Sequence, residues 1–191
     1  MTKLRAFFFF IIIFSVLPFS LSWADELSIQ FSDHSRTGER LESSFDIVGD
    51  ISYDTVDAIR NGITAKFFIT FQLSNSARFS GRSKSTFREQ SESFNIFYDV
   101  WENSFVLEDN IRKNHHIAHS YSDILGTMNT AINPLIMNLT GFEHTGQVYI
   151  RAKIKIQTIR LFPPFGIFLL FFDPWNFESG WTQTEVTLQN M

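Results

Sequence analysis

The chain has 191 residues, of which 16 are basic and 20 acidic, so its formal charge is −4. This acidic balance argues against nucleic acid as a partner, because binding to the phosphate backbone requires clustered Lys and Arg. The sequence contains no cysteine. Disulfides and a lipid anchor on an N-terminal cysteine are therefore excluded, and ordinary packing must stabilise the fold.

Residues 1–24 have the three parts of a secretory signal peptide. A positively charged start precedes a twelve-residue apolar run, Ala6–Leu17. Small residues, Ser22 and Ala24, then stand at positions −3 and −1 of an expected cleavage site. The alternative is an uncleaved membrane anchor, although the run is shorter than the roughly 20 residues that a spanning helix needs. We expect cleavage after Ala24 and export to the periplasm.

Removal of the leader would change the charge and leave a single β-rich domain over residues 25–191. Two of the 16 basic residues lie in the leader, which leaves 14 against 20 acidic residues, or a formal charge of −6. The chain has 23 phenylalanines, six of them in the leader. The domain is long enough to enclose a core, and we expect that core to be unusually aromatic.

Most of the mature chain alternates apolar and polar residues with a period of two, as strands with one buried face do. The polar residues 32–42 and the serine-rich residues 75–84 are expected to be loops. The basic residues near the second loop are interpreted as solvated, rather than as a patch for anionic lipid or phosphate. Strands are expected at 27–31, 45–51, 65–73, 87–101 continuing as a hairpin to 109, 147–158 and 181–188.

Two segments have helical patterns. Thr55–Asn61, capped by Asp54 and ended by Gly62, is expected to be a short helix. Tyr121–Leu139 has apolar residues at three- and four-residue spacing, which predicts a long helix. Pro134 inside it predicts a kink or the start of a second short helix. The predicted fold is α+β, mainly β: an antiparallel sheet or sandwich of six to eight strands with one long and one short helix.

His115, His119 and Asp123 are spaced four residues apart. They would share one face if the helix extended back to His115, and imidazole with carboxylate is a reasonable zinc set. A polar, solvent-exposed start of the helix explains the three residues equally well. We therefore favour no metal and no cofactor, and keep these residues as candidates only.

The segment Leu161–Phe172 is almost wholly apolar and contains two prolines and a glycine. It is too short to span a bilayer as a helix. The favoured interpretation is a core segment packed against the sheet. The alternative is an apolar loop that contacts a protein partner or a membrane surface. In that case the contact residues would be Phe165, Phe168, Phe171, Phe172 and Trp175.

Four short motifs are spread over most of residues 27–188. They are Asp57–Ile63 leading into Phe67–Phe71, Tyr98–Glu102 followed by Phe105, Tyr149–Ala152, and Trp175 with Ser179–Trp181. Together they resemble an exported bacterial family known as domain of unknown function 4390. The resemblance implies a periplasmic or envelope protein of unassigned activity.

The sequence has no nucleophile elbow, glycine-rich phosphate loop or paired-carboxylate site, so we do not expect an enzyme. The leading hypothesis is a non-catalytic envelope module that binds a protein partner or a membrane surface through exposed aromatic side chains and strand edges. The alternative is a carrier of a small ligand or lipid, with a pocket between the sheet and the helix Tyr121–Leu139.

Overall fold

The computed structural model describes residues 27–79, 83, 85–143, 147–159 and 176–187. The predicted leader, the apolar segment Leu161–Phe172 and Trp175 lie outside these residues. Within them the chain forms ten strands and two helices, and every strand pair is antiparallel. The predicted α+β, mainly β, fold class is confirmed.

The larger of two sheets has seven strands in the order β10-β8-β3-β4-β5-β6, and β9 pairs with β8. Its longest strands alternate as predicted, with apolar side chains buried on one face and polar side chains on the other. The strands are β3 (Thr64–Ser74), β4 (Phe87–Asp99), β5 (Ser104–Asp109), β6 (His115–Ala118), β8 (Gln147–Ile159), β9 (Phe177–Glu178) and β10 (Thr182–Thr187).

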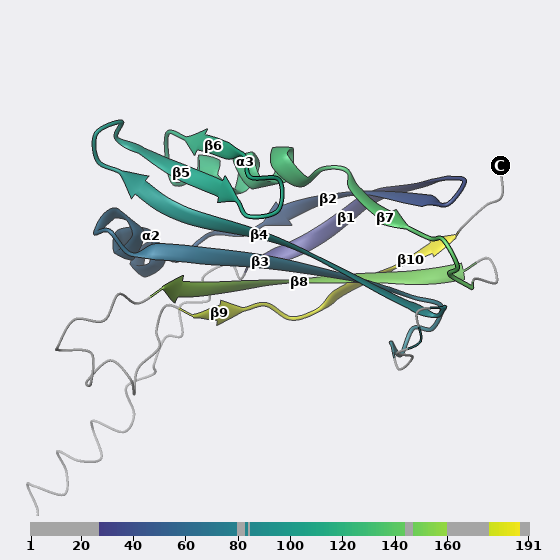
Figure 1. Ribbon diagram of the computed structural model, residues 1–191. Coiled ribbons are helices and arrows are strands. Elements are labelled where there is room, and N and C mark those ends of the chain that lie inside the picture. Colours follow the sequence, from purple (N-terminus) through teal and green to yellow (C-terminus); the bar gives the residue numbers. More distant parts are fainter. Residues whose placement is uncertain (1–26, 80–82, 84, 144–146, 160–175, 188–191) are drawn as a thin grey trace, which may run out of the picture.

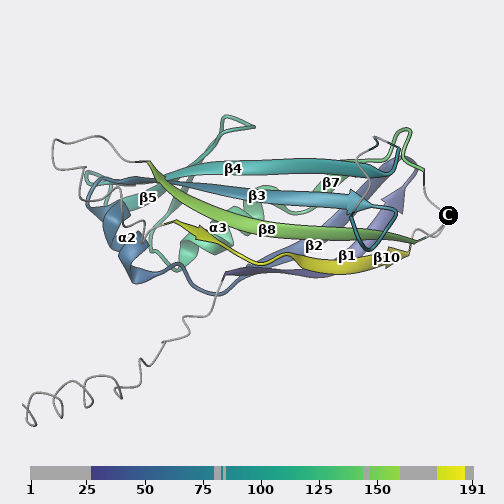
Figure 2. The same ribbon diagram turned by 90° about the horizontal axis from the view of Figure 1, so that it is seen from below.

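The smaller sheet has three strands in the order β1-β2-β7 and covers one face of the larger sheet (Figures 1 and 2). Side chains from both sheets form one core, in which the rings of Phe45 and Phe71 are 5.0 Å apart at their centroids. The five largest fully buried side chains are phenylalanines, as the composition predicts. The strands are β1 (Ser28–Thr37), β2 (Arg40–Val48) and β7 (Leu135–Asn138).

The polar residues 32–42 were expected to be a loop, and that prediction is wrong. They form the distal arms of the β1–β2 hairpin, joined at Gly38, which has a φ of +59°. Side chains on both faces of these arms are mostly polar, because few of them reach the core. The period-two signal is therefore lost although the backbone ladder continues.

The short helix, α2 (Tyr53–Arg60), lies at the end of the molecule where β3 begins and β8 ends (Figures 1 and 2). Its cap is Ser52, whose Oγ accepts the Thr55 N–H at 3.3 Å. Asp54 was predicted as the cap but lies in the first turn. Gly62 follows the helix with a φ of +89°, as its predicted role requires.

The long helix is shorter than predicted: α3 spans Asp123–Ile132. Neither a kinked helix nor a second helix follows, because the next residues form β7. Leu135 and Met137 are buried while Ile136 is exposed, so the chain changes from helical to period-two spacing after Pro134. Leu135, Ile136 and Met137 are all apolar, so the sequence of this run fits either spacing and made the helix look continuous.

The side-chain amides of Asn129 in α3 and of Asn133, the C-cap residue of α3, continue the hydrogen bonding of β2 beyond its pairing with β7. The N–H of Ile47 donates to Asn129 Oδ1 at 2.9 Å, and the N–H of Phe45 donates to Asn133 Oδ1 at 3.1 Å. The Asn133 amide also donates to the Phe45 carbonyl. These bonds fix α3 across the edge of the smaller sheet. No helix among the described residues is both long and apolar enough to cross a bilayer.

Candidate functional site

The three candidate metal ligands do not share a helical face. His115 belongs to strand β6, His119 follows the strand, and both are exposed. Asp123 begins α3, and its carboxylate accepts the Ser120 N–H at 3.1 Å. Within the part of the chain that the structure describes, no cluster of three potential ligands is present. The aromatic candidates in residues 165–175 fall outside the described residues.

The edges of the two sheets approach each other at β4 and β7 (Figure 2). Residues of these two strands, together with Thr140, line a surface cavity of about 290 Å³. β5 pairs with β4 only from Phe94 onward, so residues 87–92 of β4 have a described strand partner on one side only. Among the described strands, β7 pairs with β2 alone. Two half-paired strand edges therefore flank the cavity. Its lining residues are Arg88, Glu89, Gln90, Met137, Asn138 and Thr140.

Arg88 connects the two sheets beside this cavity. Its Nη2 donates to the Thr140 carbonyl at 2.8 Å, and its Nη1 donates to the Phe87 carbonyl at 3.1 Å. The N–H of Glu143 also donates to the carbonyl of Ser85 at 2.6 Å. These contacts hold the two strand edges at a fixed separation.

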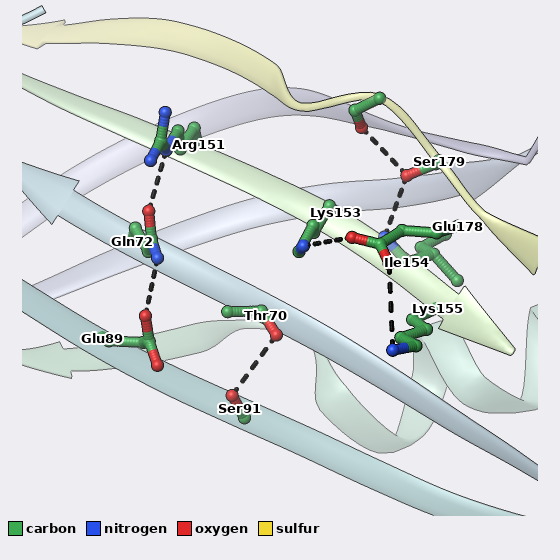
Figure 3. Close-up of polar contacts among 11 residues, drawn as sticks. Thr70, Gln72, Glu89, Ser91, Arg151, Lys153, Ile154, Lys155, Glu178 and Ser179 are labelled. Atoms are coloured by element: carbon green, nitrogen blue, oxygen red, sulfur yellow. Dashed lines mark hydrogen bonds and ion pairs between the residues drawn. The ribbon is translucent and has the colours of Figure 1, made fainter. Parts of the chain in front are cut away.

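The outer face of the larger sheet carries rows of polar side chains that run across β8, β3 and β4 (Figure 3). In one row Arg151 Nε donates to Gln72 Oε1 at 2.8 Å, and Gln72 Nε2 donates to Glu89 Oε2 at 2.6 Å. In the next row Ser91 donates to Thr70 at 3.4 Å. The first row fixes the side chain of Arg151.

Two aromatic rings from distant parts of the sequence contact Arg151. Its guanidinium carbon lies 4.1 Å from the centroid of Phe79 and 4.2 Å from that of Trp181. Phe79 is buried and has a φ of +47°, an unusual conformation for a bulky residue. Burial beneath these groups lowers the pKa of the Arg151 guanidinium below its usual value. Even so, an arginine remains charged at physiological pH.

The two neighbouring lysines form ion pairs with one glutamate, whereas Arg151 has no such partner among the described residues. Lys153 pairs with Glu178, and Lys155 lies 3.8 Å from the same carboxylate (Figure 3). The hydrogen bond from Lys153 lowers the pKa of Glu178. Among the described residues, no carboxylate forms an ion pair with Arg151, and neither Nη atom has a hydrogen-bond partner.

Ser179 holds the short linker between β9 and β10 against β8. Its Oγ accepts the Ile154 N–H at 2.9 Å, and its own N–H donates to the Ile154 carbonyl at the same distance (Figure 3). The side chain thus replaces a backbone acceptor where the outermost strand is interrupted. This attachment positions Trp181, two residues later, over Arg151 and Lys153.

Two carboxylates are buried among the described residues, Glu92 and Asp109. Both accept hydrogen bonds from Arg112 Nη1, at 2.9 and 2.8 Å. Asp109 Oδ1 also accepts the N–H groups of Ile111 and Arg112, each at 2.8 Å. Burial alone would raise the pKa of Asp109, but these hydrogen bonds outweigh it and the pKa is lowered. The arrangement fixes the β5–β6 turn.

Neither the cavity nor the Arg151 cluster was predicted from the sequence. The cavity arises from the ends of strand pairing, which a period-two pattern does not reveal. The cluster joins a serine-rich loop, β8 and a C-terminal linker. The outward-facing position of Arg151 on a predicted strand and the presence of Trp181 were the available signals.

Comparison with known proteins gives one match. No curated protein and no solved structure matches the chain. The family described as Domain of unknown function (DUF4390) matches residues 24–185, which include all described residues up to Glu185. The match begins at the last residue of the predicted leader and runs through both sheets into β10. The chain therefore belongs to this family, domain of unknown function DUF4390.

Proposed function

We propose that the protein is exported to the periplasm and works there as a non-catalytic module that binds an extended segment of a partner protein between β4 and β7. The observation that carries this proposal is the cavity of about 290 Å³ flanked by two half-paired strand edges. A half-paired edge presents backbone N–H and C=O groups that an added strand can satisfy.

The chemistry of the cavity suits a polypeptide. Arg88, Gln90 and Asn138 offer polar groups to a peptide backbone, and Met137 supplies an apolar contact for alternate side chains. The bonds of Arg88 to two carbonyls hold the strand edges in place before a partner arrives. Preorganisation of this kind lowers the entropic cost of binding.

Export is supported by the leader-like composition of residues 1–24 and by the family match, which begins at Ala24. A non-catalytic role is supported by the buried carboxylates. Asp109 receives bonds from its own turn, and Glu92 is bound by Arg112 and Gln90, so both have structural partners.

The binding proposal can be tested by selecting peptides from a random library on the purified exported protein. We expect a bound peptide to slow amide hydrogen exchange in residues 87–92 and 135–138. Asn138→Trp places a large ring in the cavity and should abolish binding. Ile136→Trp is the matched control, because it lies on the same strand but does not line the cavity.

Selected peptides that protect other strands, or that bind the Asn138→Trp protein unchanged, would contradict the proposal. Native mass spectrometry of the same material tests the alternative classes. A co-purified lipid would instead favour the carrier, and flotation with vesicles would favour a membrane-binding protein. N-terminal sequencing should begin at Asp25, and a mature chain that still begins at Met1 would refute cleavage.

A further inference from the structure

We infer that Arg151 is the centre of a binding site for a side-chain carboxylate of an acidic peptide, on the outer face of the larger sheet. Glu89 lines the cavity between β4 and β7 and also ends the row of side chains that holds Arg151, but Arg151 itself does not line that cavity. The inference does not depend on the function proposed for that cavity.

The first argument is the fixed geometry of the guanidinium. Gln72 accepts from Nε, and the rings of Phe79 and Trp181 lie 4.1 and 4.2 Å from the guanidinium carbon. The remaining donors are the two Nη groups, which have no described partner. Two parallel N–H donors of a planar guanidinium match the two oxygens of a carboxylate.

The second argument is the local balance of charge. Lys153 and Lys155, which lie on β8 with Arg151, both contact Glu178. Arg151 has no ion-pair partner among the described residues. A partly buried charge without a counterion is costly, and a bound anion would offset that cost. Glu89, which accepts a hydrogen bond from Gln72, places a negative charge nearby, and this charge repels a doubly charged anion more than a singly charged one. One negative charge, as on a carboxylate, therefore fits best.

The third argument is the backbone of Phe79. A φ of +47° at a buried aromatic residue is maintained only where the surroundings enforce it, and such residues cluster at ligand sites. Here that conformation accompanies the placement of the ring against Arg151. Trp181 remains 37% exposed beside it, so a ligand can approach the guanidinium from solvent.

The test is a nuclear magnetic resonance titration of the purified exported protein, labelled with ¹⁵N, at constant ionic strength. The probe is a capped tripeptide with Glu between two Gly residues, and the control probe has Gln in place of Glu. We expect saturable shifts of the Arg151 Nε–H and Trp181 indole N–H signals with the Glu peptide only. Absence of saturation, equal binding of the Gln peptide, or tighter binding of inorganic phosphate would overturn the inference.

Variants assign the effect to the guanidinium. Arg151→Lys keeps the charge but loses the paired donors, so the dissociation constant, followed at Trp181, should rise about tenfold or more. Arg60→Lys is the matched control and should leave binding unchanged, because Arg60 lies on α2, where its guanidinium faces the ring of Phe105 at 5.7 Å. If Arg151→Lys does not fold, Trp181→Leu retains the paired donors and should weaken binding severalfold. Unchanged binding in the folded variant would refute the site.

Discussion

At the scale of single residues, Asp109 illustrates how a buried carboxylate can organise a turn. Three bonds, two from backbone N–H groups and one from Arg112, outweigh the cost of burial and lower its pKa. The folded state therefore binds a proton at Asp109 less readily than the unfolded chain does. The stability that this provides is present above the unfolded pKa, about 3.9, and is lost as pH falls through the folded value.

Asp109→Asn should therefore flatten the acid side of the stability profile. The amide can still accept the turn N–H groups, but it does not titrate. We expect the difference in unfolding free energy between wild type and variant to shrink as pH falls below about 4. Urea unfolding at a series of pH values measures this, and a constant difference at every pH would contradict the assignment.

At the scale of elements, α3 and its C-cap residue contribute to the smaller sheet through side chains rather than backbone. The Asn133 amide both accepts from and donates to Phe45, as a neighbouring strand would. Helix and sheet are thereby joined by directional bonds in addition to the packing of Met128 and Ile132. Loss of the amide would leave two backbone groups of β2 without partners.

Asn133→Ala should reduce the unfolding free energy by about 2 kcal/mol, because it leaves the N–H and C=O of Phe45 without hydrogen-bond partners. Loss of both partners costs more than loss of one bond between exposed groups. Asn138→Ala, which removes an exposed amide bonded only to the nearby Thr140 N–H, should cost about 0.5 kcal/mol or less. Chemical denaturation compares the two. Equal losses would show that the Asn133 amide has no special role.

The interrupted outer strand gives a second prediction at this scale. Ser179→Ala removes the acceptor of the Ile154 N–H and should cost about 1–2 kcal/mol. Glu178→Gln breaks exposed ion pairs to two lysines and should cost less than about 1 kcal/mol. Faster amide exchange at Ile154 in the Ser179 variant alone would support this ranking, and the reverse order would refute it.

Strands with one buried face could be predicted from the sequence, because burial imposes the period-two pattern. Residues 65–73 and 147–158 are the clearest cases. Residues 32–42 escaped this reasoning because polar hairpin arms lack the pattern. Residues 135–138 escaped because their apolar positions fit both periods. The candidate sites were beyond a sequence argument, since cross-strand partners bring Arg151, Phe79 and Trp181 together.

At the scale of the whole molecule, the two sheets are held together by packing without any disulfide. The contact between Phe45 and Phe71 joins them directly, and both side chains are fully buried. An apolar core of this size stabilises a fold mainly by removing hydrocarbon surface from water. Loss of one of these rings would leave a cavity between the sheets.

Phe45→Ala should therefore lower the unfolding free energy by about 3–5 kcal/mol. Phe68→Ala, on the half-exposed outer face, is the matched control and should cost much less. Thermal and urea unfolding provide the comparison. Similar losses for both variants would contradict the assignment of the core to the space between the sheets.

The interruption between β9 and β10 also bears on how copies of the protein avoid associating with one another. A long, continuous outer strand would offer a template on which another chain could add, the first step of edge-to-edge aggregation. Here the outer edge of β8 is covered by a two-residue strand and a six-residue strand, which residues 179–181 separate. Neither piece offers a long flat edge. The break therefore protects this edge of the larger sheet from strand addition. By contrast, β4 and β7 keep half-paired edges to which a partner strand can add.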